Sequence, residues 1–261
     1  MLGYIKQKIT NCGEGIMSTI SRFGSFLIYS TNCFRVMFSP PFRLNSIVEQ
    51  SEFIGNRSLN IILLSAFAIG AVFGLQLGIV FSIFKAEGMM GAATAKSLAR
   101  ELSPMVTAFL ISGRAGASVT AEISTMKVTE QIDAMEVMGV DPMSYLVVPR
   151  VIACAIMSPL LTSIFSFVGM IGSFLIGVVM FNVDQGTFLD KTVFFVNIRD
   201  IVNGLEKSVV FGIITMLIAC RYGLGASKGA KGVGEATTNS VIVTLLTLLG
   251  VDFLLTCIQV L

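Results

Sequence analysis

The chain of 261 residues contains no histidine and no tryptophan, and only 13% of its residues are charged. The absence of histidine removes the commonest general base and the commonest metal ligand, which argues against zinc hydrolases and many membrane-embedded enzymes. The absence of tryptophan leaves tyrosine and phenylalanine to anchor the chain at a membrane interface.

The cysteines are few and scattered. Their number is odd and no pair has the CxxC spacing, so the sequence predicts neither a disulfide framework nor a zinc site. We interpret all five as apolar filler: Cys12, Cys33, Cys154, Cys220 and Cys257.

Hydrophobic residues are abundant. They make up 54% of the chain, and the mean hydropathy is +0.84, far above the averages of soluble domains. The sequence therefore predicts an integral membrane protein. No charged region followed by a short apolar region and a cleavage site opens the chain, so we expect the first span to be retained as an anchor.

Long apolar segments set the expected architecture, because a bilayer core needs about 20 apolar residues per helix. The sequence predicts an all-α membrane protein with about five transmembrane helices: Leu59–Phe84, Gly88–Ile111, Val148–Phe181, Ile201–Tyr222 and Ala236–Val260. The third segment exceeds thirty residues, so it either tilts strongly or breaks near Gly169, Gly172 and Gly177 to give a sixth short segment.

The first 57 residues differ from the rest because basic residues alternate with apolar ones, as in helices that lie in the membrane interface. A break at Ser39-Pro40-Pro41 predicts a second short helix around Leu44 to Phe53. We therefore divide the chain into amphipathic interfacial helices, residues 1–57, and a transmembrane domain, residues 58–261. The alternative for the first part is a disordered basic tail.

The distribution of lysine and arginine predicts the orientation. An amino terminus inside the cell also places Lys127, Arg150, Arg221, Lys228 and Lys231 inside, and only three basic residues remain in the outer loops. Positive charge favours the inner side, so we expect the carboxyl terminus outside.

A stripe of small residues runs along the first predicted span. Ala66, Gly70, Gly74 and Gly78 recur every four residues, which allows another helix to approach closely. The partner helix belongs either to a second copy at a dimer axis or to the same chain. Other faces of this span carry Leu75, Leu77 and Val80, which are candidates for contact with lipid or an apolar cavity.

Charged residues interrupt three of the predicted spans, where an unpaired charge is costly. They are Arg100, Glu101, Glu206, Lys207 and Asp252. Glu101, Lys207 and Asp252 could neutralise one another around a cavity that accepts a polar head group. The alternative is that two or three of these side chains reach the membrane interface instead.

A short acidic segment at about residues 127–139 predicts a helix that is too short to span. Thr129 is its expected N-cap, and Glu130, Asp133 and Glu136 share one side while Ile132 and Met135 lie opposite. Gly139, Asp141 and Pro142 end the helix. It is either a docking element for a soluble partner or a solvated connecting helix.

Nucleotide-binding and hydrolase motifs are absent. The glycine-rich run from Gly223 to Gly234 lacks the GxxxxGK[ST] pattern, and neither HExxH nor GxSxG occurs. We expect no catalysis by this chain and no cofactor in it. Any ATP-driven transport then requires nucleotide chemistry in another chain.

Several motifs occur together in a specific order after residue 44. They are Arg100-Glu101-Leu102-Ser103-Pro104, Gly113-Arg114-Ala115-Gly116, Ala121-Glu122, Thr129-Glu130-Gln131-Ile132-Asp133, Pro149-Arg150, Lys207-Ser208-Val209-Val210-Phe211, Gly234-Glu235-Ala236-Thr237-Thr238 and Gly250-Val251-Asp252-Phe253. This combination resembles the MlaE (YrbE) permease family of the ABC transporters associated with MCE-domain proteins.

The resemblance implies that the acidic segment is a coupling helix in a groove of a cytoplasmic ATPase subunit, which would hold the ATP and Mg²⁺. The coupling residues would be Glu130, Ile132, Asp133, Met135 and Glu136. It also implies a second copy of the chain, an MCE-domain protein on the outer side, and a phospholipid substrate, with no role for nucleic acid.

The same resemblance assigns further roles. It places Glu101, Lys207 and Asp252 near the lipid, and we add Leu75, Leu77 and Val80 as candidates for acyl-chain contact. We also expect Arg114 and Glu122 to support the coupling helix against the bundle.

The expected function is therefore that of a multi-pass permease in a bacterial inner membrane. It would move phospholipids between the inner and outer membranes through the MCE-domain partner and so maintain outer-membrane lipid asymmetry. Two alternatives are an autonomous proton- or ion-coupled carrier, which would use Glu101, Lys207 and Asp252 as a charge relay, and a membrane scaffold without transport.

Overall fold

Long helices dominate the structure, a computed structural model that describes residues 17, 21, 24–39 and 43–260. Four of the helices in these ranges are long and apolar enough to cross a membrane. They are α2 (Leu44–Ile83), α7 (Val148–Phe181), α9 (Ile198–Leu224) and α10 (Ala230–Val260). All regular secondary structure in the described ranges is helical, which confirms the predicted all-α membrane protein.

The second predicted span, Gly88–Ile111, is divided in the structure. After the short 3₁₀ turn Glu87–Met89, it consists of α3 (Met90–Ser97), the π-helical segment η2 (Leu98–Leu102) and α4 (Ser103–Ile111). Pro104 has no backbone N–H, so it cannot donate the α-helical hydrogen bond to the carbonyl of Arg100. The π-helical segment lies directly beside this missing bond. The helical run continues through η3 (Ser112–Gly116) into α5 (Ala117–Val128).

The amino-terminal part is only partly described. Residues 24–37 are helical, whereas most of the residues expected to make an amphipathic helix, and the proline break, lie outside the described ranges. The second short helix expected around Leu44 to Phe53 is the beginning of α2. No proline interrupts the sequence between these residues and the first span, so one helix continues across the boundary drawn at residue 57.

The third span is a single helix. Gly169, Gly172 and Gly177 do not break α7, and all three are buried. The next helix, α8 (Gln185–Phe195), begins at Asp184, whose side chain accepts a hydrogen bond from the backbone N–H of Thr187 at 2.9 Å.

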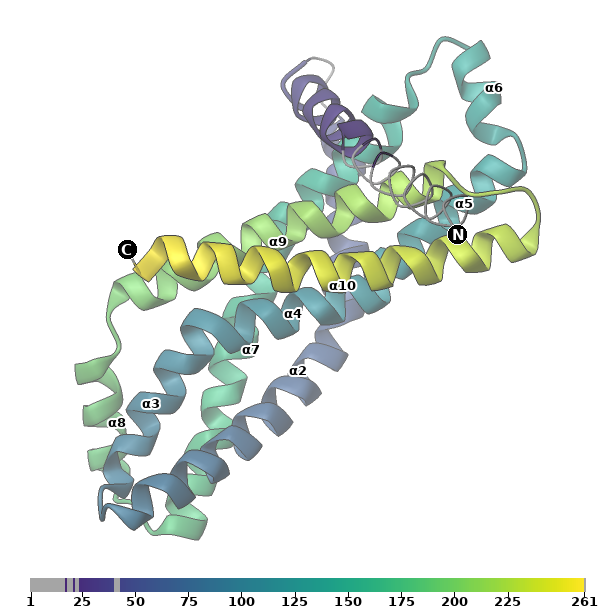
Figure 1. Ribbon diagram of the computed structural model, residues 1–261. Coiled ribbons are helices and arrows are strands. Elements are labelled where there is room, and N and C mark those ends of the chain that lie inside the picture. Colours follow the sequence, from purple (N-terminus) through teal and green to yellow (C-terminus); the bar gives the residue numbers. More distant parts are fainter. Residues whose placement is uncertain (1–16, 18–20, 22–23, 40–42, 261) are drawn as a thin grey trace, which may run out of the picture.

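Small residues allow α2 and α7 to lie against each other along their length (Figure 1). A Cβ atom on Gly70 would collide with the backbone carbonyl of Gly169, and one on Gly172 would collide with that of Phe67. The small-residue stripe is therefore a tight helix interface, and its partner is within the same chain.

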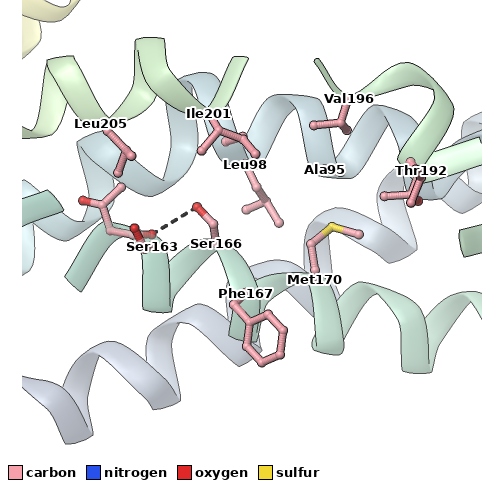
Figure 2. Close-up of a pocket in the computed structure, with 13 residues that line it drawn as sticks. Ala95, Leu98, Ser163, Ser166, Phe167, Met170, Thr192, Val196, Ile201 and Leu205 are labelled. Carbon is pink, nitrogen blue, oxygen red and sulfur yellow. Dashed lines mark hydrogen bonds between the residues drawn. The ribbon is translucent and has the colours of Figure 1, made fainter. Parts of the chain in front are cut away.

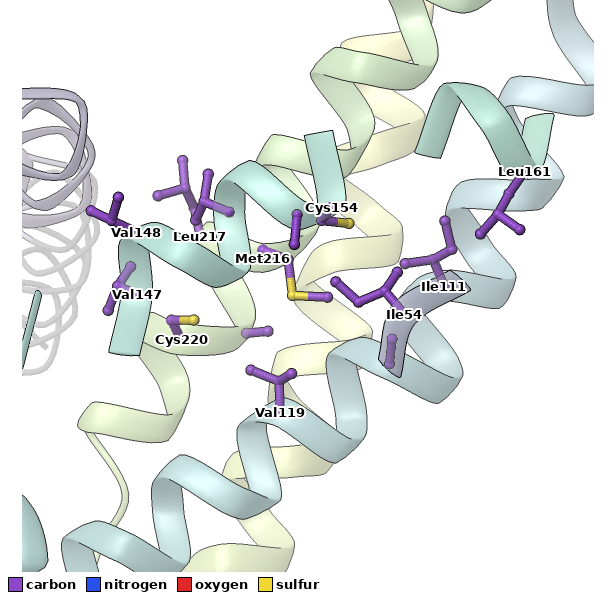
Figure 3. Packing of buried hydrophobic residues seen from close by; sticks show 14 of the residues in the cluster. Ile54, Ile111, Val119, Val147, Val148, Cys154, Leu161, Met216, Leu217 and Cys220 are labelled. Atoms are coloured by element: carbon purple, nitrogen blue, oxygen red, sulfur yellow. The ribbon is translucent and has the colours of Figure 1, made fainter. Parts of the chain in front are cut away.

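Buried hydrophobic residues join this pair to α4, α5 and α9 (Figure 3). The main cluster includes Ile54 of α2, Ile111 of α4, Val119 of α5, Cys154 of α7 and Met216 of α9. The described cysteines are free thiols, and three of the four are buried.

The α2–α7 interface makes a stability prediction. Gly70→Ala should lower the free energy of unfolding by about 1–3 kcal/mol, because the new methyl group forces two backbones apart. Thermal unfolding of the purified protein in detergent measures the effect. Gly250→Ala is the matched control, because a Cβ there meets nothing within 4 Å and alanine favours a helix. Equal melting temperatures for the two variants would contradict close packing at Gly70.

Candidate functional site

A cluster of four polar side chains lies between η2, α9 and α10. The Lys207 side chain is completely buried, and its ammonium group donates to Glu101 Oε2 at 2.5 Å, Asp252 Oδ1 at 3.2 Å and Thr256 Oγ1 at 2.7 Å. These three acceptors match the three N–H donors of a lysine. The structure thus brings together all three charged residues that the sequence predicted around a cavity.

Close backbone packing positions these groups. Gly204 lies one turn before Lys207 on α9, and a Cβ atom on it would collide with the backbone carbonyl of Ala99 in η2. The missing side chain lets α9 approach η2, which carries Glu101. On α10, Asp252 and Thr256 are four residues apart and therefore share one face.

Thr256 was not identified from the sequence. Its hydroxyl also lies 2.9 Å from the backbone carbonyl of Asp252 and 3.3 Å from Glu101 Oε2. The i, i+4 spacing places Thr256 on the same face of α10 as Asp252, but an uncharged threonine does not need a counterion in a membrane span, so it carries a weaker sequence signal.

The cluster has an excess of acid and is open on one side. Two carboxylates face one ammonium, and 36% of the Glu101 side chain is exposed compared with 17% of Asp252 and none of Lys207. A polar ligand can therefore reach Glu101 without unfolding the bundle. Displacing this carboxylate would make the Lys207 ammonium available to an anionic group such as a phosphate.

The other charges in the predicted spans lie elsewhere. Arg100 and Lys96 face Asp200, at 3.6 and 3.9 Å. Asp200 also accepts the backbone N–H of Asn197 in a capping box at the start of α9. Glu206 is exposed on α9 and is not part of the cluster.

The three apolar candidates on α2 do not join the cluster within one chain. Leu77 packs against a separate group of buried residues that includes Phe188 and Met90. Leu75 is half-buried, and Val80 is 49% exposed. The helix α2 packs mainly on α7. The contact of these three residues with lipid stays a prediction.

The predicted coupling helix is present as α6 (Gln131–Val137), beside the end of α5 in Figure 1. Ile132 is 2% exposed and Met135 is half-buried, so both pack on the core, as the helical spacing predicted. Glu130, Asp133 and Glu136 are exposed.

The start of α6 differs from the prediction. Glu130, with φ of +61°, is the N-cap, and its side chain caps nothing. Thr129 instead ends α5 and donates its hydroxyl to the backbone carbonyl of Thr125 at 2.9 Å. Threonine hydroxyls readily make such local bonds, so Thr129 was wrongly assigned as the cap.

A salt bridge fixes α6 to α5. Lys127 Nζ donates to Asp133 Oδ1 at 2.6 Å, and this hydrogen bond raises the pKa of the lysine above its usual value. Asp133 is therefore partly neutralised by its own chain, which leaves Glu130 and Glu136 as the unpaired acids of this helix in the structure.

Arg114 and Glu122 are attached to different helices than expected. Arg114 donates to the backbone carbonyl of Phe53 at 3.0 Å and to the Ser58 hydroxyl at 2.7 Å, so its hydrogen bonds are to α2 rather than to α6. Glu122 accepts from Arg150 at 2.8 Å, which ties α5 to the beginning of α7. Arg150 was not identified from the sequence as the partner of Glu122.

Two apolar residues at the end of α6 were also missed. Val137 is 88% exposed and Met138 is 71% exposed, next to the exposed acids. Both residues follow Glu136 directly in the sequence. Helical spacing could not predict their exposure, because the helix ends at Val137. The exposed surface of α6 is therefore partly acidic and partly apolar.

Metal binding has no support in the described ranges, where no group of three or more Cys, Asp or Glu side chains could hold a metal ion.

Comparison with known proteins identifies close relatives. Residues 47–258 match the family described as "Permease MlaE". A probable ABC transporter permease protein of Rickettsia typhi is 40% identical over 244 residues, which covers 94% of each chain. One from Synechocystis is 42% identical over 208 residues, 80% of this chain and 79% of the relative, and one from Pyropia yezoensis is 41% identical over 211 residues, 81% and 80%.

The cluster makes a prediction about relative stability. Lys207→Met should cost about 3–5 kcal/mol, because it leaves two carboxylates facing each other without a cation. Glu101→Gln should cost less, because Lys207 keeps Asp252 as its counterion and glutamine can still accept a hydrogen bond. Thermal unfolding in detergent at neutral pH tests this order. A Glu101→Gln variant less stable than Lys207→Met would show that the lysine is not the centre of the cluster.

Proposed function

Because the chain belongs to the MlaE permease family of ABC transporters, we propose that it is the transmembrane subunit of a phospholipid transporter in a bacterial inner membrane. Its apolar helices and its family identify a multi-pass membrane protein. The relatives are permease subunits, which are not themselves catalytic, and an ABC permease works with an ATPase and as a dimer. The lipid cargo, the MCE-domain partner and exchange with the outer membrane are our proposals.

The observation that carries the lipid proposal is the Lys207 cluster. A fully buried ammonium with an exposed carboxylate partner is costly for a purely structural element in a membrane. It suits a permease whose cargo has both a charged head group and apolar tails. The phosphate would compete with Glu101 for Lys207 while the acyl chains contact apolar helix surfaces.

A second copy would complete the lipid cavity. One face of α10 next to Asp252 is largely uncovered, with Leu246 at 64%, Leu249 at 46% and Phe253 at 68% exposure. A second copy on this face would enclose the open side of the cluster. Within this arrangement Leu75, Leu77 and Val80 remain our proposed acyl-chain contacts.

The acidic and apolar surface of α6 supports docking of the ATPase. Glu130, Asp133 and Glu136 would face basic residues in its groove, with Val137 at the apolar edge. Ile132 and Met135, whose side chains pack inward, would keep the helix attached to the bundle.

Arg114 and Glu122 support this coupling indirectly. Glu122 fixes α5, which leads into α6, through its pair with Arg150. Arg114 holds the same helical run against α2. By holding these helices together, both residues would allow a movement of α6 to be transmitted to the rest of the bundle.

Reversing charge on α6 should remove the ATPase without unfolding the permease. In Glu130→Lys combined with Glu136→Lys, which leaves the Lys127–Asp133 salt bridge in place, the loss of acidic charge should reduce ATPase association at least tenfold, measured by co-purification in mild detergent. An unchanged elution volume on size-exclusion chromatography checks folding.

The matched control reverses two acids at the opposite end of the molecule. Glu87→Lys combined with Asp190→Lys changes the net charge equally, far from α6, and should retain the ATPase. Loss in both variants would point to net charge rather than α6 as the determinant, and retention in both would exclude α6 as the docking element.

The function itself is tested by purifying the tagged chain and identifying bound proteins and lipids by mass spectrometry. We expect an ATPase subunit, an MCE-domain protein and phospholipid. Recovery of the permease with neither protein partner would contradict the proposal and favour the autonomous carrier.

A further inference from the structure

A cavity lies away from the Lys207 cluster. It has a volume of about 470 Å³ and lies between α3, η2, α7, α8 and α9 (Figure 2). Most of the side chains around it are apolar, among them Leu98, Phe167, Met170, Ile201 and Leu205. Such a volume falls within the range of about 300–1,000 Å³ typical of pockets that bind small ligands.

The cavity and the Lys207 cluster lie on different sides of α9. Leu205 lines the cavity, and Lys207, two residues later, points about 200° away around the helix. The segment η2 separates the two, since Leu98 and Ala99 face the cavity and Glu101 belongs to the cluster. A ligand in this cavity would therefore be distinct from the cargo proposed above.

The rim of the cavity faces the surroundings of the membrane-spanning helices. Phe167 on α7 is 69% exposed, and Val193 on α8 is 77% exposed. An opening bordered by such exposed apolar residues is accessible to lipid chains, for which an apolar cavity offers a matching surface.

Polar groups are present inside and beside the cavity. Thr162 is 2% exposed and lines it, and its hydroxyl has no hydrogen-bond partner in the structure. Beside the wall, Lys96 and Arg100 follow the lining residues Ala95 and Ala99, and both face Asp200. Two cations against one carboxylate leave one net positive charge there.

We propose that this cavity binds a phospholipid, with one acyl chain between α7 and α9 and the phosphate near Lys96 and Arg100. The apolar walls select a hydrocarbon chain, and the surplus positive charge selects an anionic head group. The proposal rests on the membrane location of the chain and does not require that the chain transport lipid.

Photolabelling tests the site in the complete chain. The protein is placed in nanodiscs that contain phosphatidylglycerol with a diazirine in one acyl chain, and labelled residues are mapped by mass spectrometry. We expect Phe167 and Val193 to be labelled several-fold more strongly than Leu64, an exposed residue of α2 outside the cavity.

Filling the cavity should remove this preference. Ser163→Phe places a ring at the cavity wall and should lower labelling there at least threefold, with Ser163→Leu as a smaller substitute if the first variant does not fold. Ser82→Phe is the matched control on α2, because the hydroxyls of Ser82 and Ser163 both donate to carbonyl groups of their own helices. It should leave labelling of the cavity unchanged.

The head-group contact is tested with a second probe, diacylglycerol carrying the same diazirine chain but no phosphate. Phosphatidylglycerol should label the cavity several-fold better, and Lys96→Gln should reduce that difference. Equal labelling by both probes would overturn the phosphate contact.

Two results would overturn the acyl-chain site. One is labelling of the cavity no stronger than that of Leu64 and insensitive to Ser163→Phe. The other is loss of cavity labelling when the chain is purified with its membrane partners, with recovery when they are removed, which would assign the cavity to a partner helix.

Discussion

The structure depends on the burial of one positive charge in an apolar helix bundle. The Lys207 ammonium has no contact with solvent, and its three donors are all satisfied by side chains from two other elements. This requirement fixes the position of α10 relative to α9, because Asp252 and Thr256 must face the same point. It also explains why α9 carries glycine at residue 204, where the backbone of η2 has to come close.

One helical run links this cluster to the cytoplasmic side in the predicted orientation. From Met90 to Val128 the chain continues through α3, η2, α4, η3 and α5, with Glu101 in its first half and Glu122 near its end. The helix α6, our proposed coupling helix, follows directly. A displacement of α6 would therefore reach Glu101 along a single run, and its two π-helical segments are the places where the hydrogen-bond register already departs from an α-helix.

Composition and periodicity predicted the fold class and the main helices well, because a bilayer imposes strong and simple requirements on sequence. The partners of the small-residue stripe could not be predicted, since Gly70 and Gly74 would pack equally well on a helix of the same chain or of a second copy. Helix boundaries were also uncertain. The continuity of α2 and the division at Leu98–Leu102 depend on local hydrogen bonding that hydropathy does not report.

Charge in the spans predicted the Lys207 cluster because an intramembrane charge needs a counterion. The same argument could not decide which partner each charge would find, and Arg100 pairs with Asp200 while its neighbour Glu101 pairs with Lys207. Uncharged members such as Thr256 carry little sequence signal. Such a residue joins the cluster only if its hydroxyl comes within hydrogen-bonding distance of the other members, and this distance is set by the three-dimensional packing of the helices.

The proposed function requires that this chain move phospholipid only when an ATPase drives it. The direct measurement is transfer of a fluorescent phospholipid out of proteoliposomes that contain the chain, its ATPase subunit and its MCE-domain partner. We expect transfer that requires ATP and that Lys207→Met greatly reduces. Transfer at the same rate without ATP or the partner chains would contradict the account and assign the activity to an autonomous carrier.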